Sequence, residues 1–209
     1  MKIELERVAP MEIEARSFEI IGQELPHPID ESLAPIIKRV IHTTADFDYA
    51  DTLCFSDGVL EKALDAIRAG AAIVTDTTMA MSGINKRALA KHGGEAFCFI
   101  GDPDVAEAAG MSGTTRAVQA MEKAAKLDRP LIFAIGNAPT ALIRIYEMIS
   151  EGRLDPKLVI GVPVGFVNVV QSKELIMTAD VPYIVARGRK GGSNVAASIC
   201  NALLYMLGR

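Results

Sequence analysis

The sequence predicts an α/β fold: a single-domain three-layer sandwich with a mostly parallel central sheet and two extra N-terminal helices. Two patterns carry this prediction, because short apolar runs alternate with amphipathic helical segments and each run is apolar throughout. Such strands are typical of a parallel sheet covered by helices on both faces. No repeat or linker divides the chain, so we expect one domain over 1–209, with helices in 1–45 and the α/β core in 46–209.

The two N-terminal helices precede the alternating pattern. The first is expected over 11–25, with Met11 and Phe18 on its apolar face, and it ends at a Pro-His-Pro turn. The second is expected to begin near Asp30 as N-cap and to run to residue 44. His42 then lies in its last turn, where the helix dipole stabilises an imidazolium and favours a proton donor near neutral pH.

Six strands are expected in the remaining chain. They are predicted at 52–55, 72–75, 97–100, 131–135, 158–162 and 183–186. Apolar residues at helical spacing lie between them, as in Val59, Ala63 and Ile67. The uncharged stretch 191–208 is close to the length of a membrane span, but it contains Ser198 and Asn201. We therefore expect a buried helix, packed on the sheet or at a subunit contact.

Composition excludes several classes of protein. A net charge of -4 and a pI near 5.5 argue against broad nucleic-acid binding. The three cysteines include no Cys-x-x-Cys pair, so we expect reduced thiols and no metal site. Residues 1–6 have no apolar signal-peptide core, which favours a cytoplasmic protein with no membrane segment.

Three of the apolar runs open into loops rich in glycine and polar residues, at 136–140, 161–168 and 187–194. Because the carboxyl ends of parallel strands meet at one edge of a sheet, we expect these loops to form a ligand site. The third loop carries three cations, and a helix beginning near Gly192 would add its positive end. The expected ligand therefore has anionic groups.

Six segments together resemble the precorrin-8X methylmutase family, which the cobalt-early pathway calls cobalt-precorrin-8 methylmutase. They are 17–21, 41–46, 75–79, 136–140, 161–168 and 187–193, and the resemblance extends from about Arg16 to the C-terminus. It implies cobalamin biosynthesis: migration of a ring methyl from C-11 to C-12, giving hydrogenobyrinate or cobyrinate. It also implies a homodimer with pockets shared between chains, and it places the proposed catalytic acid at His42.

The chemistry of this reaction is compatible with the residues present. A methyl shift within one macrocycle is intramolecular and redox-neutral, so we expect no cofactor, although the substrate can itself carry cobalt. Catalysis then requires positioning of the ring and a proton donor. A corrinoid edged by carboxylates would require an apolar slot with cations and amide donors at its rim. The substrate-binding candidates are Arg16, Ser17, Thr43, Thr77, Thr78, Met79, Arg116, Asn137, Gly165, Phe166, Arg187, Lys190, Gly191, Gly192 and Ser193.

Several of these candidates also have a structural interpretation. Thr77 and Thr78 could cap a helix, Arg116 could be a solvated charge, and Asn137 could satisfy loop backbone. Met79 and Phe166 are as well explained by a core position.

Two rival classes of function remain, a nucleotide enzyme and a tetrapyrrole carrier. A Rossmann nucleotide enzyme is disfavoured because neither a Gly-x-Gly-x-x-Gly turn after the first strand nor a P-loop occurs. A non-catalytic tetrapyrrole carrier stays open as the alternative, and it would not need His42.

Overall fold

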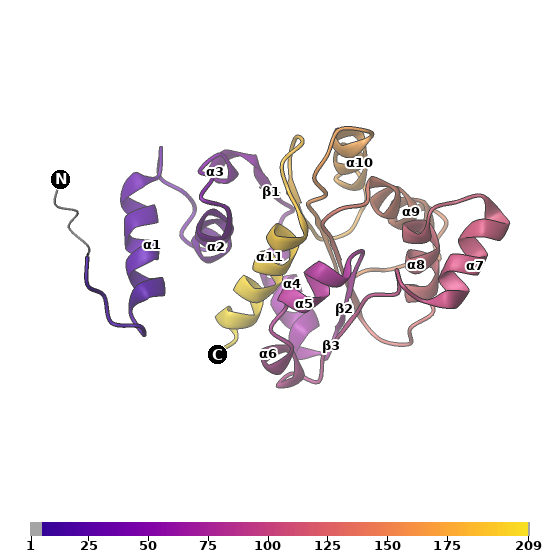
Figure 1. Cartoon of the computed structure of the whole chain (residues 1–209), viewed down its shortest axis with the longest axis horizontal. Helices are drawn as coiled ribbons and strands as arrows, with labels where there is room; N and C mark the ends of the chain where they lie inside the picture. The colour runs from indigo at the N-terminus through magenta and orange to yellow at the C-terminus, as the bar shows by residue number, and fades with distance from the viewer. Residues whose placement is uncertain (1–5, 209) are drawn as a thin grey trace.

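The computed structural model describes residues 6–208, and a six-stranded sheet with strand order β1-β6-β5-β4-β2-β3 forms its centre (Figure 1). All neighbouring strands are parallel except β1, which pairs antiparallel with β6 at one edge. The mostly parallel sheet is thereby confirmed. The strands are β1 Leu53–Phe55, β2 Ala72–Thr75, β3 Glu95–Phe97, β4 Leu131–Ile135, β5 Leu158–Gly161 and β6 Tyr183–Ala186. The signal-peptide prediction falls almost wholly on residues 1–5, which lie outside the described residues.

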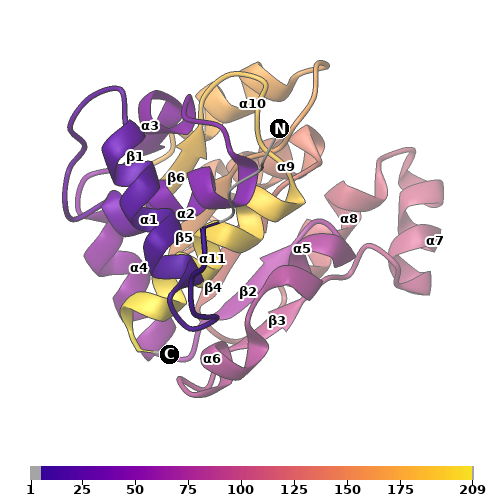
Figure 2. The same ribbon diagram turned by 60° about the vertical axis from the view of Figure 1, so that its left-hand side comes forward.

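Helices cover both faces of this sheet. They are α1 Ile13–Glu24, α2 Ala34–Thr44, α3 Tyr49–Thr52, α4 Val59–Arg68, α5 Thr78–Gly83, α6 Lys86–Ala90, α7 Pro103–Ser112, α8 Arg116–Ala124, α9 Pro139–Ser150, α10 Val169–Ile176 and α11 Ser193–Met206. Strand β4 shows why the runs are continuously apolar. Its Ile132 joins the core under α2, α4 and α11, whereas Phe133 joins the core under α8, α9 and α10. The three-layer sandwich is therefore confirmed, and α7 and α8 project beyond α5 (Figure 2).

Several predicted boundaries were wrong, and the largest differences are at β3 and at the start of α2. Strand β3 covers Glu95–Phe97 and not 97–100, because its position is set by pairing with β2, whose Val74 lies opposite Phe97. Helix α2 begins at Ala34, four residues beyond the expected cap. The Asp30 carboxylate instead accepts hydrogen bonds from the backbone N–H and the hydroxyl of Ser32, at 2.8 and 2.7 Å, and forms a separate turn.

The first helix is also shorter than predicted, since it covers Ile13–Glu24. Met11 precedes it and is 94% exposed, so the prediction that Met11 belongs to the apolar face was wrong. Phe18 does pack against the core, together with the buried Ile21.

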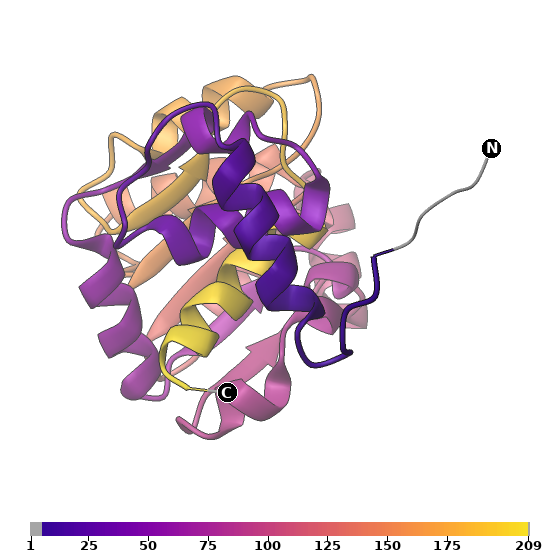
Figure 3. The same cartoon turned by 90° about the vertical axis from the view of Figure 1, so that its left-hand side faces the viewer.

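Helix α2 lies between α1 and α11, and α1 covers it from outside (Figure 3). Ile36, Val40 and Ile41 are at most 1% exposed and share one core with α11. Arg39 joins the three helices, because its guanidinium lies over the rings of Phe18 and Tyr205, 5.2 and 4.8 Å from their centroids. Helix α2 is therefore part of the core of its own chain.

Helix α11 is the expected buried helix. Nine of its residues are buried, and its contacts are with α2, α4 and α5 and with the sheet of its own chain. Its apolar sequence is explained by this core position, so it gives no support to a subunit contact. Within residues 6–208, no helix has both the length and the apolar character needed to cross a membrane.

Candidate functional site

The three predicted loops lie together at the carboxyl edge of the parallel strands. Backbone hydrogen bonds connect them: Gly192 N donates to Val162 O at 2.9 Å, and Gly165 N donates to Arg189 O at 3.2 Å. Val164 N also donates to a carbonyl of the first loop, Gly136 O, at 3.4 Å. The predicted convergence of these loops is confirmed.

Two glycines permit this close packing. A Cβ on Gly136 would lie 2.7 Å from the Cα of Ser193, and one on Gly191 would lie 2.1 Å from the Val162 carbonyl oxygen. Both distances are far inside van der Waals contact, so a side chain at either position would separate the loops. The glycines therefore bring the N-terminus of α11 against the ends of β4 and β5, and α11 begins at Ser193 as predicted.

The carboxylate of Asp76 binds the backbone of the first loop, 136–140. This carboxylate directly follows β2, is 2% exposed, and accepts hydrogen bonds from the backbone N–H groups of Gly136, Asn137 and Ala138 at 2.9, 2.8 and 2.6 Å. Burial raises the pKa of Asp76, and the three N–H donors counter that rise. Asp76 lies in one of the six segments that carry the family resemblance but is not among the predicted site residues; its position as an acidic residue directly after a buried strand was the signal that could have identified it.

The residues after Asp76 are arranged around the start of α11. Thr77 is the N-cap of α5, because its Oγ1 accepts a hydrogen bond from Ala80 N at 3.1 Å. The same oxygen lies 2.8 Å from Ser193 Oγ. The capping interpretation of Thr77 is thus confirmed, and the structure also brings this predicted site residue together with Ser193. Thr78 is exposed in the first turn of the same helix.

His42 lies in the last turn of α2, as predicted. The helix ends at Ala45, which adopts a left-handed conformation with φ of 53° and donates its N–H to Ile41 O at 2.7 Å. The imidazole is exposed and meets the Phe18 ring edge-on, with the centroids 5.6 Å apart. The imidazole is therefore accessible to solvent and to a bound ligand at this end of α2.

Two small cavities flank this end of α2. One, of about 230 Å³, separates α1 from α2 and includes Ser17 and His42 in its lining. The other, of about 240 Å³, lies against α11 and includes Thr43 and Asn194. The hydroxyls of Ser17 and Thr43 donate to the carbonyls of Ile13 and Arg39 in their own helices, at 2.8 and 2.9 Å.

Two of the cations predicted to bind substrate, Arg187 and Lys190, already have carboxylate partners. The Lys190 ammonium lies 2.6 Å from Asp46 and 2.6 Å from Asp48, which raises the pKa of Lys190. Arg187 pairs with Glu174 at 3.0 Å, which raises the pKa of Arg187. Lys190 therefore ties the 187–192 loop to the segment that follows His42.

The structure does not bring two of the predicted arginines to His42. Arg16 pairs with Glu6 at 2.7 Å and lines a different cavity along α1. Arg116 is exposed at the first turn of α8, across the sheet from α2 (Figure 1). Asn137 is exposed, and its backbone N–H donates to Asp76 at 2.8 Å.

Apolar side chains are exposed around the loop cluster. Met79 is 70% exposed, and Phe166 and Val167 are each 80% exposed. The core interpretation of Met79 and Phe166 was therefore wrong. Phe166 follows Gly165, whose φ is 142°, and the guanidinium of Arg189 lies 5.4 Å from the centroid of its ring. This edge thus combines apolar surface with cations, as a large anionic ring requires.

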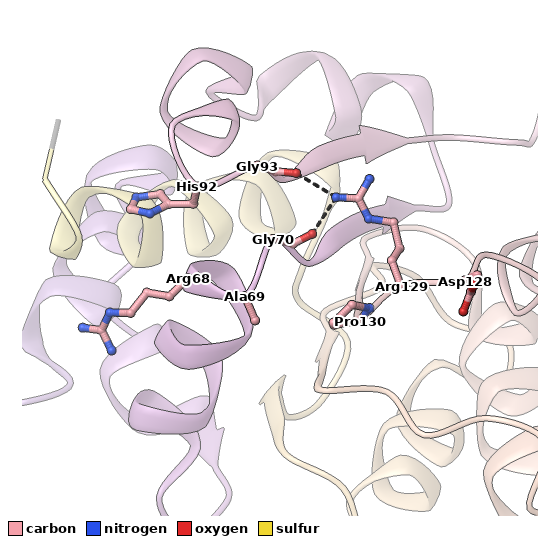
Figure 4. Close-up of a pocket in the computed structure, with 8 residues that line it drawn as sticks. All are labelled: Arg68, Ala69, Gly70, His92, Gly93, Asp128, Arg129 and Pro130. Carbon is pink, nitrogen blue, oxygen red and sulfur yellow. Dashed lines mark hydrogen bonds between the residues drawn. The ribbon is translucent and has the colours of Figure 1, made fainter.

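A larger cavity, of about 610 Å³, lies at the opposite edge of the sheet, where the amino ends of β2, β3 and β4 meet (Figure 4). Its lining includes Arg68, His92 and Arg129, and Arg129 Nη2 donates to the carbonyl of Gly93 at 2.8 Å, and also to that of Gly70. This arginine joins the entries to β2, β3 and β4. We regard it as structural, because the strand ends that carry the loop cluster face the other way. Over residues 6–208, no group of three or more His, Cys, Asp or Glu could hold a metal ion.

Known proteins similar to this chain were found by sequence and by structure. A family model described as Precorrin-8X methylmutase matches residues 12–206. A cobalt-precorrin-8 methylmutase of Salmonella typhimurium is 50% identical over 208 residues, covering 95% of this chain and 96% of the relative. A precorrin-8X methylmutase of Pseudomonas aeruginosa is 38% identical, covering 84% and 85%. The crystal structure of precorrin-8x methyl mutase from Thermus thermophilus superimposes with a TM-score of 0.84 at 41% identity, covering 93% and 96%.

These matches extend over nearly the whole chain and include all six segments that carry the resemblance. The chain therefore belongs to the precorrin-8X methylmutase family, and its activity class is that of an isomerase.

Proposed function

We propose that this methylmutase moves the ring methyl of precorrin-8X, or of its cobalt-containing counterpart, from C-11 to C-12, giving hydrogenobyrinate or cobyrinate. The observation that carries the proposal is the position of His42: an exposed imidazole at a helix C-terminus, beside loops that offer cations and backbone donors. The carrier alternative is disfavoured, because relatives that share most of the chain are named methylmutases.

His42 is the general acid in this account. Methyl migration interrupts and rebuilds the conjugation of the macrocycle, and a positioned proton donor accelerates such a step by about 10²- to 10⁴-fold. Because the shift is intramolecular and redox-neutral, we propose that no cofactor takes part.

Substrate carboxylates would bind at the 187–193 loop. Arg187 and Lys190 are exposed, and their carboxylate partners can turn to water when a substrate carboxylate replaces them. The backbone N–H groups of Gly191 and Ser193 lie at the start of α11, whose positive end favours an anion, and Gly192 fixes this turn through its own hydrogen bond to Val162 O. Exchange of one carboxylate for another keeps each cation paired throughout binding.

We also propose a homodimer that completes the site. The cavities beside His42, of about 230 and 240 Å³, are smaller than the roughly 300–1,000 Å³ of typical ligand pockets. The exposed Met79, Phe166 and Val167 could be covered by a second chain together with bound substrate.

We propose one domain over 1–209, because α2 and α11 share one core. We also propose that the protein is cytoplasmic, because its three cysteines are free thiols, which suits a reducing compartment.

Turnover of purified substrate, followed by visible absorption, tests the proposed activity. With substrate in excess over protein, the enzyme should convert all of the precorrin-8X or cobalt-precorrin-8 to a product that has the altered spectrum of the rearranged ring. A spectrum that changes only in proportion to bound protein, with unrearranged corrinoid recovered after denaturation, would identify a carrier instead.

A further inference from the structure

Lys173 on α10 is a fully buried lysine whose ammonium is bound by backbone carbonyls. Its exposed fraction is 0%, and Nζ donates hydrogen bonds to Gly188 O and Lys190 O, both at 2.8 Å. Among the ion pairs of residues 6–208, none includes Lys173. A lysine so deeply buried without a carboxylate is uncommon, since lysine is among the residues least often fully buried.

The burial of this amine opposes its charge. Burial lowers the pKa of Lys173 to about 8, because the charged ammonium loses its hydration in the protein interior. Burying this charge therefore costs stability. An apolar side chain of similar length would fill the same space at a lower desolvation cost. The feature that such a side chain could not supply is a pair of hydrogen bonds to the 187–192 loop.

Those two hydrogen bonds hold a loop without regular secondary structure. Gly188 and Lys190 lie on either side of Arg189, between β6 and α11, and Gly188 has a left-handed φ of 79°. With both carbonyls turned toward Lys173, the loop has a fixed path across the end of α10. The adjacent Glu174 pairs with Arg187, so consecutive residues of α10 hold the backbone and one cation of the same loop.

The contact continues from the loop to the end of α2. The main chain of Lys190 accepts from Lys173, and the side chain of Lys190 binds Asp46 and Asp48, which follow His42. A displaced loop would therefore change the position of a candidate carboxylate-binding cation. It would also remove the support of the segment in which α2 ends.

We propose that Lys173 is a positioning residue that fixes the 187–192 loop, so that Arg187 and Lys190 meet the substrate carboxylates and Lys190 supports the segment after His42. This inference rests on the proposed function for the role of those cations. The role in loop structure is independent of any substrate and can be tested without one.

Amide hydrogen exchange on ligand-free protein tests the structural part. Lys173→Met removes the ammonium and keeps the length, whereas Lys157→Met is a matched control: that lysine is exposed and pairs with Asp155 at the opposite edge of the sheet. In Lys173→Met we expect peptides covering 187–193 to exchange at least about tenfold faster, with β4 and β5 unchanged. The control should match wild type. Unchanged protection in a folded Lys173→Met protein would overturn the proposal.

Lys173→Gln provides a second variant in case Lys173→Met does not fold, because its amide retains one donor for a carbonyl. The same selective loss of protection at 187–193 is expected. Failure of both variants to fold would overturn the proposal, because Lys173 would then be required for the whole fold and not for one loop.

The functional part is tested by a double-mutant cycle with product titration. Lys173→Met and Lys190→Met should each weaken corrinoid binding, and the double variant should bind no more than about twofold weaker than the weaker single variant, because one residue acts through the other. Lys173→Met should also raise KM more than it lowers kcat. Additive losses would contradict the proposal. If wild type neither binds nor converts corrinoid, the proposed function fails, while the exchange experiment still decides whether Lys173 fixes the loop.

Discussion

The ammonium of Lys190 lies 2.6 Å from a carboxylate oxygen of Asp46, and Asp46 lies four residues after His42. This contact joins the loop after β6 to the end of α2, two parts of the chain separated by 144 positions. It places the cationic loop and the candidate acid beside each other within one chain. In the proposed function, a substrate carboxylate bound by Lys190 would therefore lie near the segment that follows His42.

Removal of either loop cation should weaken binding more than it slows chemistry. Arg187→Ala and Lys190→Ala are each expected to lower corrinoid affinity by about tenfold, because these cations would hold carboxylates equally in ground and transition states. The loss should be partly reproduced by added salt in wild type, since both side chains are about half exposed. Product titration measures the effect, with Lys157→Ala as the control. Wild-type affinity in both loop variants would contradict carboxylate binding by these cations and would give the loop a structural role only.

Asp76→Asn should destabilise the protein without altering the size of the side chain. The amide replaces one acceptor oxygen by an N–H₂ group, which then faces either the backbone N–H of Gly136 or the backbone N–H groups of Asn137 and Ala138. Leaving a buried donor unsatisfied lowers the free energy of unfolding by about 1–3 kcal/mol. Urea denaturation measures it, and Asp128→Asn, at the opposite edge, is the control. A change below about 0.5 kcal/mol would contradict the anchoring role.

Lys173 should give a characteristic pH dependence of stability. Its folded pKa of about 8 lies below the ordinary value of 10.5, so between these values the unfolded chain binds a proton that the folded protein does not. Stability from this group therefore rises as pH increases from about 8 to 10.5, by up to about 3 kcal/mol, and is constant below that range. The difference in unfolding free energy between wild type and Lys173→Met isolates the effect. A difference that is flat across this range would contradict it.

Subunit mixing tests the proposed dimer. Because Lys190 and the end of α2 meet within one chain, Arg116 on α8 is the better candidate to come from a partner. Mixed and re-equilibrated His42→Asn and Arg116→Ala chains should recover about a quarter of wild-type activity at low substrate, since half the dimers are mixed and each has one intact site. Activity no higher than the mean of the two parents would contradict sharing of this pair. Sedimentation across a dilution series would show whether the chain dimerises.

The sequence predicted the parts of the fold that depend on local pattern. Strands β2, β4 and β6 have the predicted bounds, because each is a mostly apolar run that is followed directly by a glycine or a charged residue. Strand β3 was misplaced since its half-buried residues carry a weak pattern and its register depends on β2. The start of α2 was misplaced because Asp30 stabilises a turn, which offers the same signal as a helix cap.

The candidate site was predicted in its location and only partly in its contacts. Convergence of the loops follows from parallel strand direction, and the place of His42 follows from helix length. The partners of Arg187 and Lys190 come from distant parts of the chain, which no local pattern reveals. Lysine is among the residue types least often fully buried, so no local pattern predicts the burial of Lys173, which depends on the loop folded over it.

The most direct test of the account is single-turnover methyl migration by His42→Asn with enzyme in excess over substrate. Asparagine keeps a polar side chain of moderate size but cannot donate a titratable proton, so the rate should fall by about 10²-fold or more while product affinity stays near wild type. His92→Asn, at the opposite edge of the sheet, is the matched control and should retain the wild-type rate. A His42→Asn rate within a few-fold of wild type would contradict the claim that His42 is the catalytic acid.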